Sequence, residues 1–231
     1  MAEELRHELR IDYHRQMVLV EGKVRHLFAL VIDGIPASTE ALLSGDVAVA
    51  SRLAAREVVI DELYRECENI IVELLALQAP VASELRYFLA VLRLVPELER
   101  SHDLVEHISR RGARGIGQKL TPRTRGLVER MGTLDTEMWQ LMGEAWTERD
   151  LAKVDAVIWR DNEMDELHVA LMGDLANGTI ELPVAMEMAL VARFYERLGD
   201  HAVNLGERVR SLAVAPPAAE DLPAVSGGVD G

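Results

Sequence analysis

A pair of carboxylates stands four residues apart in the stretch ERLGDHAVNLGERV, which runs from Glu196 to Val209. If this stretch is helical, Glu196 and Asp200 lie on nearly the same face and can offer their oxygens to one external point. Gly199 stands between them, although glycine destabilises a helix interior by about 1 kcal/mol relative to alanine. Oxygen-rich sites suit hard or borderline cations, and a glycine leaves room for an ion. The spacing is compatible with metal binding, although a single such pair is more often solvated surface and Gly199 is equally explained as a tolerated small residue.

The same acidic spacing recurs at fixed distances along the chain. LVPELERSHDLVEHI, which begins at Leu94, aligns with VARFYERLGDHAVNL, which begins 97 residues later at Val191. A second alignment, at an offset of 104 residues, pairs AREVVIDEL with IWRDNEMDEL. Together the alignments give four candidate metal-ligating pairs, two in each half: Glu57 and Asp61, Glu99 and Asp103, Asp161 and Asp165, Glu196 and Asp200.

Repetition in register is what favours a shared role for these pairs. Most acidic pairs at this spacing are solvated surface residues, since their mutual repulsion costs only ~0.2–0.5 kcal/mol. Because the same pairs recur in both halves, the interpretation as solvated surface residues explains the four pairs together less well than it explains any one pair. If the second and third helices of each half pack side by side, each half gathers four carboxylates, and that much negative charge requires a cation.

A carboxylate-bridged di-iron bundle is the alternative, because its helices carry Glu-x-x-His. Glu99 and His102 have this spacing. The residue that matches His102 in the second half is Gly199, so the repeat keeps the acidic pairs and loses the histidine. The sequence shows no Ser/His/Asp set, glycine-rich phosphate loop or Cys/His cluster, and nothing in it favours ordinary enzymatic catalysis.

Apolar residues at three- and four-residue spacing predict the helices that carry these pairs. Gly34 and Pro36 are predicted to separate the first two helices, and Asp46 to cap the second. The predicted helices are 11–32, 47–77 and 85–108 in the first half, and 127–146, 151–175 and 184–212 in the second. This pattern predicts an all-α fold of six helices, arranged as two tandem three-helix bundles related by a pseudo-two-fold axis.

The predicted domain organisation follows from the same breaks. Residues 1–112 form the first three-helix repeat, 113–125 a basic, glycine-rich linker, and 126–212 the second repeat. The arginines of the linker region would offer a basic contact surface to partners. The tail, 213–231, is rich in Pro, Ala and Gly, and we expect it to be disordered.

Composition restricts the partners and the compartment. The chain has 25 basic and 39 acidic residues and a net charge of −14, which repels nucleic acid and anionic lipids. Its one cysteine, Cys67, falls on an apolar helical position, which indicates a core residue and excludes an internal disulfide. MAEELRHELR lacks the apolar core of a signal peptide, and no uncharged run approaches the roughly 18 residues of a spanning helix. We therefore expect a cytoplasmic protein.

Several of these features occur together in one known family. A duplicated three-helix unit with E-R-x-x-D-x-x-x-N in its last helix, as in ERLGDHAVNL, resembles the phosphate uptake regulator family, PhoU. The stretch LQAPVASELRYFLAVLRLVPELER, before the first-half counterpart, strengthens the likeness, which covers about residues 10–212. The first half departs from the pattern, with His107 where Asn204 stands in the second.

The resemblance implies a cytoplasmic, non-enzymatic negative regulator of the bacterial phosphate starvation response. Such a protein couples the ATP-binding subunit of the phosphate ABC transporter to a sensor histidine kinase and modulates phosphate uptake. It is peripheral to the inner face of the membrane through protein contacts, and a homodimer is compatible with it. The resemblance also assigns multinuclear metal clusters, with Fe, Zn, Mn or Mg as candidates, to the eight carboxylates above. A ferritin-like carboxylate-bridged metalloprotein or oxidase is the alternative.

Overall fold

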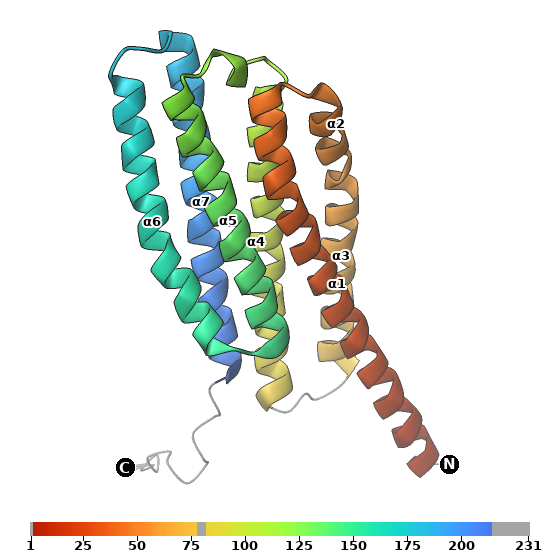
Figure 1. Ribbon diagram of the computed structural model, residues 1–231. Helices are drawn as coiled ribbons and strands as arrows, with labels where there is room; N and C mark the ends of the chain where they lie inside the picture. The colour runs from red at the N-terminus through yellow and green to blue at the C-terminus, as the bar shows by residue number, and fades with distance from the viewer. Residues whose placement is uncertain (1, 78–81, 214–231) are drawn as a thin grey trace, which may run out of the picture.

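The chain is a bundle of long helices, and the prediction of an all-α fold is confirmed (Figure 1). The computed structural model describes residues 2–77 and 82–213, and these ranges contain no strand. The QAP segment at 78–80 and the predicted tail beyond 213 lie outside them. The helices are α1 Ala2–Ser44, α2 Val47–Ala55, α3 Glu57–Leu77, α4 Ala82–Gly112, the short 3-10 helix η1 Gly117–Lys119, α5 Pro122–Glu148, α6 Leu151–Ala176 and α7 Leu182–Ala213.

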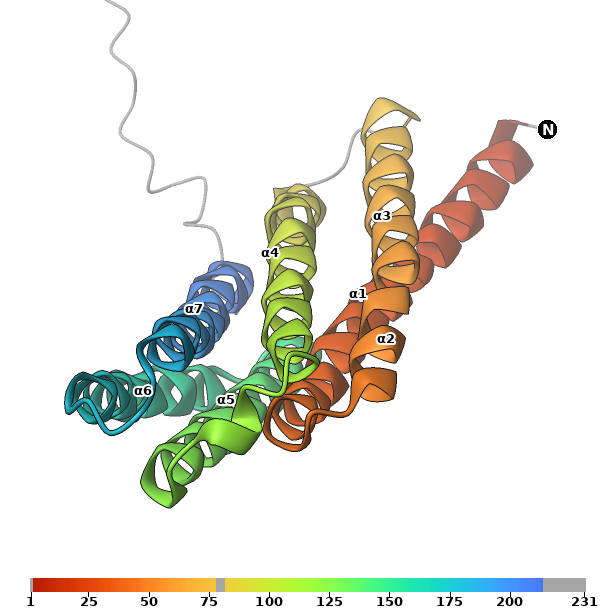
Figure 2. The same cartoon turned by 90° about the horizontal axis from the view of Figure 1, so that it is seen from above.

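Four long helices, α1, α4, α5 and α7, form the centre of the bundle (Figure 2). On one side α3 packs on α1 and α4, and on the other α6 packs on α5 and α7. The halves meet where α1 contacts α5 and where α4 contacts α7. This is the set of contacts that a pseudo-two-fold axis between two three-helix units produces. One continuous apolar core joins all of them, so the division at 112 and 126 stays a prediction.

Matched N-terminal caps begin corresponding helices in the two halves. A carboxylate oxygen of Asp46 accepts hydrogen bonds from the amides of Ala48 and Val49 at 2.8 and 3.2 Å. Asp150, 104 residues later, accepts one from the amide of Ala152 at 2.8 Å. Such caps satisfy amide groups that have no partner within the helix, typically contributing about 1 kcal/mol. The predicted cap at Asp46 is therefore present, and its counterpart has the spacing of the repeat.

The first helix does not end at Gly34 and Pro36, so that prediction is wrong. Pro36 lies inside α1, where its missing amide and its ring cost ~3 kcal/mol or more in an isolated helix. Burial of the flanking residues offsets this cost, because Ile35 is fully buried and Gly34 lies against Val105 of α4. A β-carbon on Gly34 would stand 2.9 Å from a methyl carbon of Val105, so the glycine allows this close approach.

The predicted helix 47–77 contains a turn at Arg56, and α2 and α3 together occupy its place. The amide of Arg56 donates to the carbonyl of Leu53 at 3.0 Å, which is a tighter turn than an α-helix makes. The Arg56 side chain also reaches the carbonyl of Leu30 on α1 at 3.5 Å. The turn therefore accompanies a contact with a neighbouring helix.

The linker region is tied to α7 by ion pairs, so part of its basic charge is offset within the chain, and its role as a contact surface for partners stays a prediction. Arg111 and Arg114 form ion pairs with Glu187 at 3.0 and 2.9 Å, and the Arg111 guanidinium lies 4.6 Å from the ring centre of Phe194. Arg110 pairs with Glu106. Arg111 and Arg114 thus hold the end of α4 against α7, whereas the Arg110 pair lies within α4 itself.

One helix, α1 between Ile11 and Ser44, is long and apolar enough to cross a membrane by length and composition alone. More than half of its apolar window, 56%, is buried inside the bundle. Its apolar face contacts α4 and α5, which is the behaviour of a core helix in a helical bundle.

Gly112 allows the end of α4 to meet the backbone of α1. A β-carbon there would stand 2.1 Å from the carbonyl oxygen of Ala41, and a backbone atom cannot easily move away. We predict that Gly112→Ala lowers the free energy of unfolding by about 1–3 kcal/mol in urea titrations. Gly173→Ala on α6 is the control, because a β-carbon there meets nothing within 4 Å and should stabilise the helix slightly. Equal stability of the two variants would contradict the packing at Gly112.

Candidate functional site

The four acidic pairs lie on two pairs of adjacent helices. In the first half, Glu57 and Asp61 are on α3, next to α4, which carries Glu99 and Asp103. In the second half the corresponding pairs are on α6 and α7, which also pack side by side. The acidic residues flank the buried stripes of their helices, as the helical periodicity indicated, and so lie at the edges of the α3–α4 and α6–α7 contacts.

The second-half carboxylates are close enough to perturb one another. The pKa of Asp161 is raised to about 6, first by burial and then by the charges of Asp165, Asp200 and Glu196. The pKa of Glu196 is also raised, by burial and by Asp200, while Arg193 opposes the shift. All four predicted residues of this half therefore share one electrostatic environment in which each negative charge is unfavourable to the others.

The first-half carboxylates form a similar cluster. Burial raises the pKa of Glu99, and the charges of Asp103, Asp61 and Glu57 raise it further. Burial also raises the pKa of Asp103, against an opposing contribution from His107. The structure thus brings together the two sets that the repeat predicted.

Proximity alone does not form a ligand shell. The described residues include no group of three or more His, Cys, Asp and Glu side chains placed to hold one ion. Some of the carboxylates instead form ion pairs along their own helices, Asp61 with Arg65 at 3.2 Å and Glu196 with Arg193. The metal role of the eight residues therefore stays a prediction, and binding would require small side-chain movements.

One local feature of the second half fits a bound cation. The Oε2 atom of Glu196 is buried and has no hydrogen-bond partner among the described residues. A β-carbon on Gly199 would stand 3.3 Å from Oδ1 of Asp161 and 3.5 Å from side-chain carbons of Met138 and Met164, so glycine allows these α5 and α6 side chains to pack close to the α7 backbone. In the first half the matching position holds His102, which is buried, so the two clusters differ at this point. Oxygen donors of this kind suit hard or borderline metals.

Asp135 on α5 is a further carboxyl group that the sequence reasoning missed. It is fully buried, and neither carboxyl oxygen has a hydrogen-bond partner among the described residues. Burial, followed by the charge of Asp161, raises the pKa of Asp135 well above its ordinary value, so the group is held neutral. The sequence did contain a signal for this buried carboxyl group. Asp135 interrupts an apolar stripe, and the corresponding position of the first half, 104 residues earlier, holds the apolar residue Val31.

A serine, a histidine and a glutamate meet between α4 and α7, although the sequence suggested no such set. Ser101 Oγ lies 2.9 Å from His201 Nδ1, and His201 Nε2 lies 3.6 Å from a carboxylate oxygen of Glu97. Ser101 is fully buried, and its hydroxyl also donates to the Glu97 carbonyl at 2.6 Å. A buried hydroxyl engaged in this way cannot reach a substrate, so the set joins two helices.

His102, the histidine of the Glu-x-x-His spacing, is buried, and burial and the charge of Arg56 lower its pKa to about 4. Within the described residues, no group of three or more His, Cys, Asp and Glu side chains is placed to hold an ion with it. The geometry therefore gives no support to a ferritin-like di-iron centre.

Comparisons with known proteins identify relatives over most of the chain. Residues 24–112 and 128–209 match the PhoU domain. The phosphate-specific transport system accessory protein PhoU homolog 2 of Mycobacterium tuberculosis is 29% identical over 204 residues, which cover 87% of this chain and 96% of that protein. The PhoU homolog of Deinococcus radiodurans is 32% identical over 182 residues, 76% of this chain and 84% of the relative.

Solved structures of similar architecture support the fold. The crystal structure of PhoU from Pseudomonas aeruginosa matches with a TM-score of 0.80 and 24% identity, covering 87% of this chain and 98% of the other. The phosphate transport system regulatory protein PhoU from Streptococcus pneumoniae matches with a TM-score of 0.75 and 21% identity, covering 88% and 95%. At these identities the likeness shows the fold alone.

The raised pKa of Asp161 makes a prediction about stability and pH. A native pKa of about 6 lies above the unfolded value of roughly 4, so the native state binds the proton more tightly. This group therefore destabilises the native state as pH rises from about 4 to 6. In metal-free protein at pH 7, Asp161→Asn should raise the free energy of unfolding by about 1 kcal/mol, after allowance for solvent screening.

Urea unfolding at pH 7 and near pH 4 measures this effect. The gain from Asp161→Asn should disappear near pH 4, because wild-type Asp161 is then protonated in the native state. Asp33→Asn, at an exposed position on α1, is the control and should change little at either pH. A stability gain that is the same at both pH values would contradict the electrostatic origin of the effect.

Proposed function

The chain belongs to the PhoU family of phosphate transport accessory proteins, and we propose that it acts as a negative regulator of the bacterial phosphate starvation response. It would act as an adaptor between the ATP-binding subunit of the phosphate-specific ABC transporter and a sensor histidine kinase. The observation that carries this proposal is the family match itself, which spans both halves of the duplicated unit.

We place the protein in the cytoplasm, at the inner face of the membrane through contacts with these partners. We also propose that its role is regulatory and not enzymatic. The buried Ser101 supports this, since the one serine–histidine–glutamate set described above cannot meet a substrate. A homodimer is compatible with this role and is tested by sedimentation.

Exposed apolar side chains on the outer helices support an adaptor function. Trp159 on α6 is 70% exposed, although tryptophan is one of the side chains most often buried at protein interfaces. Val58 on α3 and Val169 on α6 are exposed to a similar extent. Apolar contacts are thus available on the outer helices of both halves, as binding to two partners requires.

We further propose that the carboxylate clusters bind cations, with Fe, Zn, Mn and Mg as the candidates. In the second half Asp161 and Asp165 of α6 would bind from one side of the ion, and Glu196 and Asp200 of α7 from the other. A bound cation supplies positive charge that offsets the mutual repulsion of these carboxylates. Carboxylates held in this way would fix α6 against α7. The role of such a centre would be structural or regulatory.

Metal content tests the role of the second-half cluster. In protein equilibrated with Mn²⁺ or Zn²⁺ and desalted, Glu196→Ala with Asp200→Ala should lower the metal content measured by elemental analysis, because half of one ligand set is lost. Glu62→Ala with Glu73→Ala removes two exposed carboxylates of α3 and should leave metal content unchanged. Wild-type metal content in the Glu196 and Asp200 variant would favour a solvated acidic surface instead.

Loss of the protein tests its regulatory role. In the organism of origin, deletion of the gene should lead to expression of phosphate starvation genes in phosphate-rich medium, and reintroduction of the full chain should silence them. Purified chain should bind the transporter ATPase subunit or the sensor kinase in biolayer interferometry. If the starvation genes remain silent after deletion and neither partner binds, the proposed function is wrong.

A further inference from the structure

An open groove runs along the seam between α1 and α5, which are neighbours in the bundle. Two cavities of about 510 and 350 Å³ lie in it, and Gln140 lines both. On α1 the groove extends from Arg25 to Leu43, a length of about 27 Å at 1.5 Å per residue. Within residues 2–77 and 82–213, no helix covers this seam on the side away from α4 and α7.

Two glycines of α5 bring the helices close together at the floor of the groove. A β-carbon on Gly132 would stand 2.3 Å from Oγ1 of Thr39, and one on Gly143 would stand 3.2 Å from a methyl carbon of Ile32. Larger residues at these positions would separate the helices or fill the groove. The groove is therefore a consequence of small residues at the contact.

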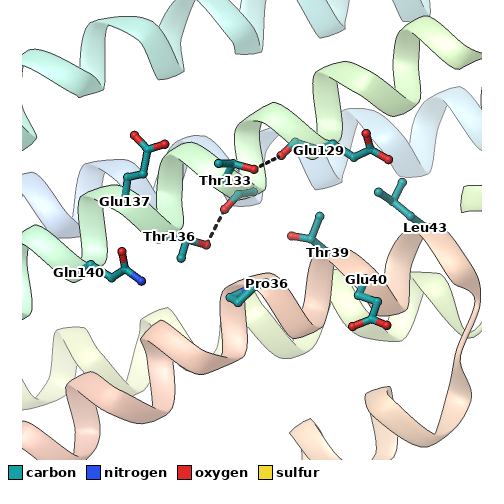
Figure 3. A pocket seen from close by; sticks show the side chains of 10 residues that line it. Pro36, Thr39, Glu40, Leu43, Glu129, Thr133, Thr136, Glu137 and Gln140 are labelled. Atoms are coloured by element: carbon teal, nitrogen blue, oxygen red, sulfur yellow. Dashed lines mark hydrogen bonds between the residues drawn. The ribbon is translucent and has the colours of Figure 1, made fainter.

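The floor offers mainly apolar contacts. Pro36 and Thr39 of α1 face Thr133 and Thr136 of α5 across the groove (Figure 3). The hydroxyls of Thr133 and Thr136 donate to backbone carbonyls of α5 at 2.9 and 2.7 Å, so these donors are already engaged. Their methyl groups, the Pro36 ring and the side chain of Phe28 remain for a ligand to contact.

The rim of the groove is acidic. One arginine, Arg25, stands there, and it pairs with Glu21 at 3.2 Å. Glu40 and Glu129 have no ion-pair partner among the described residues, and Figure 3 shows their carboxylates pointing away from the centre of the groove. Of the five glutamates that line the two cavities, Glu137 pairs with Arg130 and Arg160, and Glu144 and Glu148 pair with Lys153. Among the described residues, the unpaired negative charge of the rim therefore lies at Glu40 and Glu129.

Charge distinguishes between the occupants that could fill such a groove. A second copy of this chain carries a net charge of −14 and would be repelled by the rim. The C-terminal segment 214–231 contains Glu220, Asp221 and Asp230 but no lysine or arginine, so its charge is also unfavourable. A helix with one apolar face and basic residues beside it matches both the floor and the rim.

We propose that the α1–α5 groove is the docking site for a basic amphipathic helix of a partner protein. About five helical turns of that helix would lie in the groove, with its apolar face on the floor and its lysines or arginines at Glu40 and Glu129. This inference deepens the proposed adaptor function, because it names the surface and the chemistry of the contact. It rests on that function for the existence of a partner.

A synthetic peptide tests the groove without any natural partner. The probe is a fluorescein-labelled helical peptide of about 18 residues, with leucine at i, i+3, i+4 and i+7 and lysine on the flanks. Fluorescence anisotropy with the full chain should show saturable binding that weakens as salt is raised. The same peptide with glutamate in place of lysine should not bind. Absence of saturable binding of the lysine peptide would overturn the proposal.

Matched charge variants locate the peptide on the protein. Glu40→Gln with Glu129→Gln should raise the Kd roughly 3- to 10-fold, because two partly exposed charge contacts are lost. Neither carboxylate has an ion-pair partner within the part of the chain that the structure describes, so folding should be unaffected, which circular dichroism verifies. Glu62→Gln with Glu73→Gln, on the exposed face of α3, makes the same change in net charge elsewhere. An equal loss of affinity in both variants would reduce the binding to general electrostatics and overturn the proposal.

A second variant distinguishes the partner helix from a second copy of the chain. Thr133→Arg places a long cationic side chain at an exposed position in the groove and should abolish peptide binding without changing the sedimentation coefficient. If it converts a wild-type dimer to monomer, the groove is an interface between copies and the proposal is wrong. The chain could bind the peptide in the groove but bind neither the kinase nor the transporter ATPase. That result would contradict the adaptor function and leave the groove assignment intact.

Discussion

Burial of two tryptophans on α5 fixes how the two halves of this chain pack. The indole nitrogen of Trp139 donates to the carbonyl of Leu198 on α7 at 3.1 Å, so the side chain is both buried and satisfied. Trp146 lies with its ring centre 6.5 Å from that of Phe28 on α1 and 6.1 Å from that of Tyr87 on α4. Aromatic side chains contribute large buried areas to cores. One helix thus contacts the other three central helices through two residues.

The candidate site depends on that packing. Leu198, the acceptor for Trp139, directly precedes Gly199, which borders the Asp161 carboxylate. The acidic clusters therefore lie at the edge of the core, where partial burial raises the pKa values of Asp161, Glu196, Glu99 and Asp103. The repeat does not make the halves identical. The second half has the buried carboxyl group of Asp135 where the first has Val31, and it has Gly199 where the first has the buried side chain of His102.

The two seams between the halves differ in character. At the α4–α7 seam, Ser101 meets His201 and Arg111 meets Glu187, so polar contacts close the interface. At the α1–α5 seam, glycines bring the helices together and leave a groove lined by threonine methyls and glutamates. A closed seam holds the bundle together, whereas an open one with unpaired carboxylates has surface available for another molecule. This asymmetry between the seams suits an adaptor that keeps its own fold while contacting a partner.

The sequence by itself determined the helical class, the Asp46 cap and the eight acidic positions, because apolar periodicity and capping are properties of local sequence. The duplicated offsets also predicted which carboxylates would meet. Tertiary packing alone decided that α1 continues through Pro36, that Ser101 meets His201, and that Asp135 is buried with no hydrogen-bond partner among the described residues. These outcomes depend on which helix covers which face, and long-range burial can exceed the few kcal/mol that local propensity supplies.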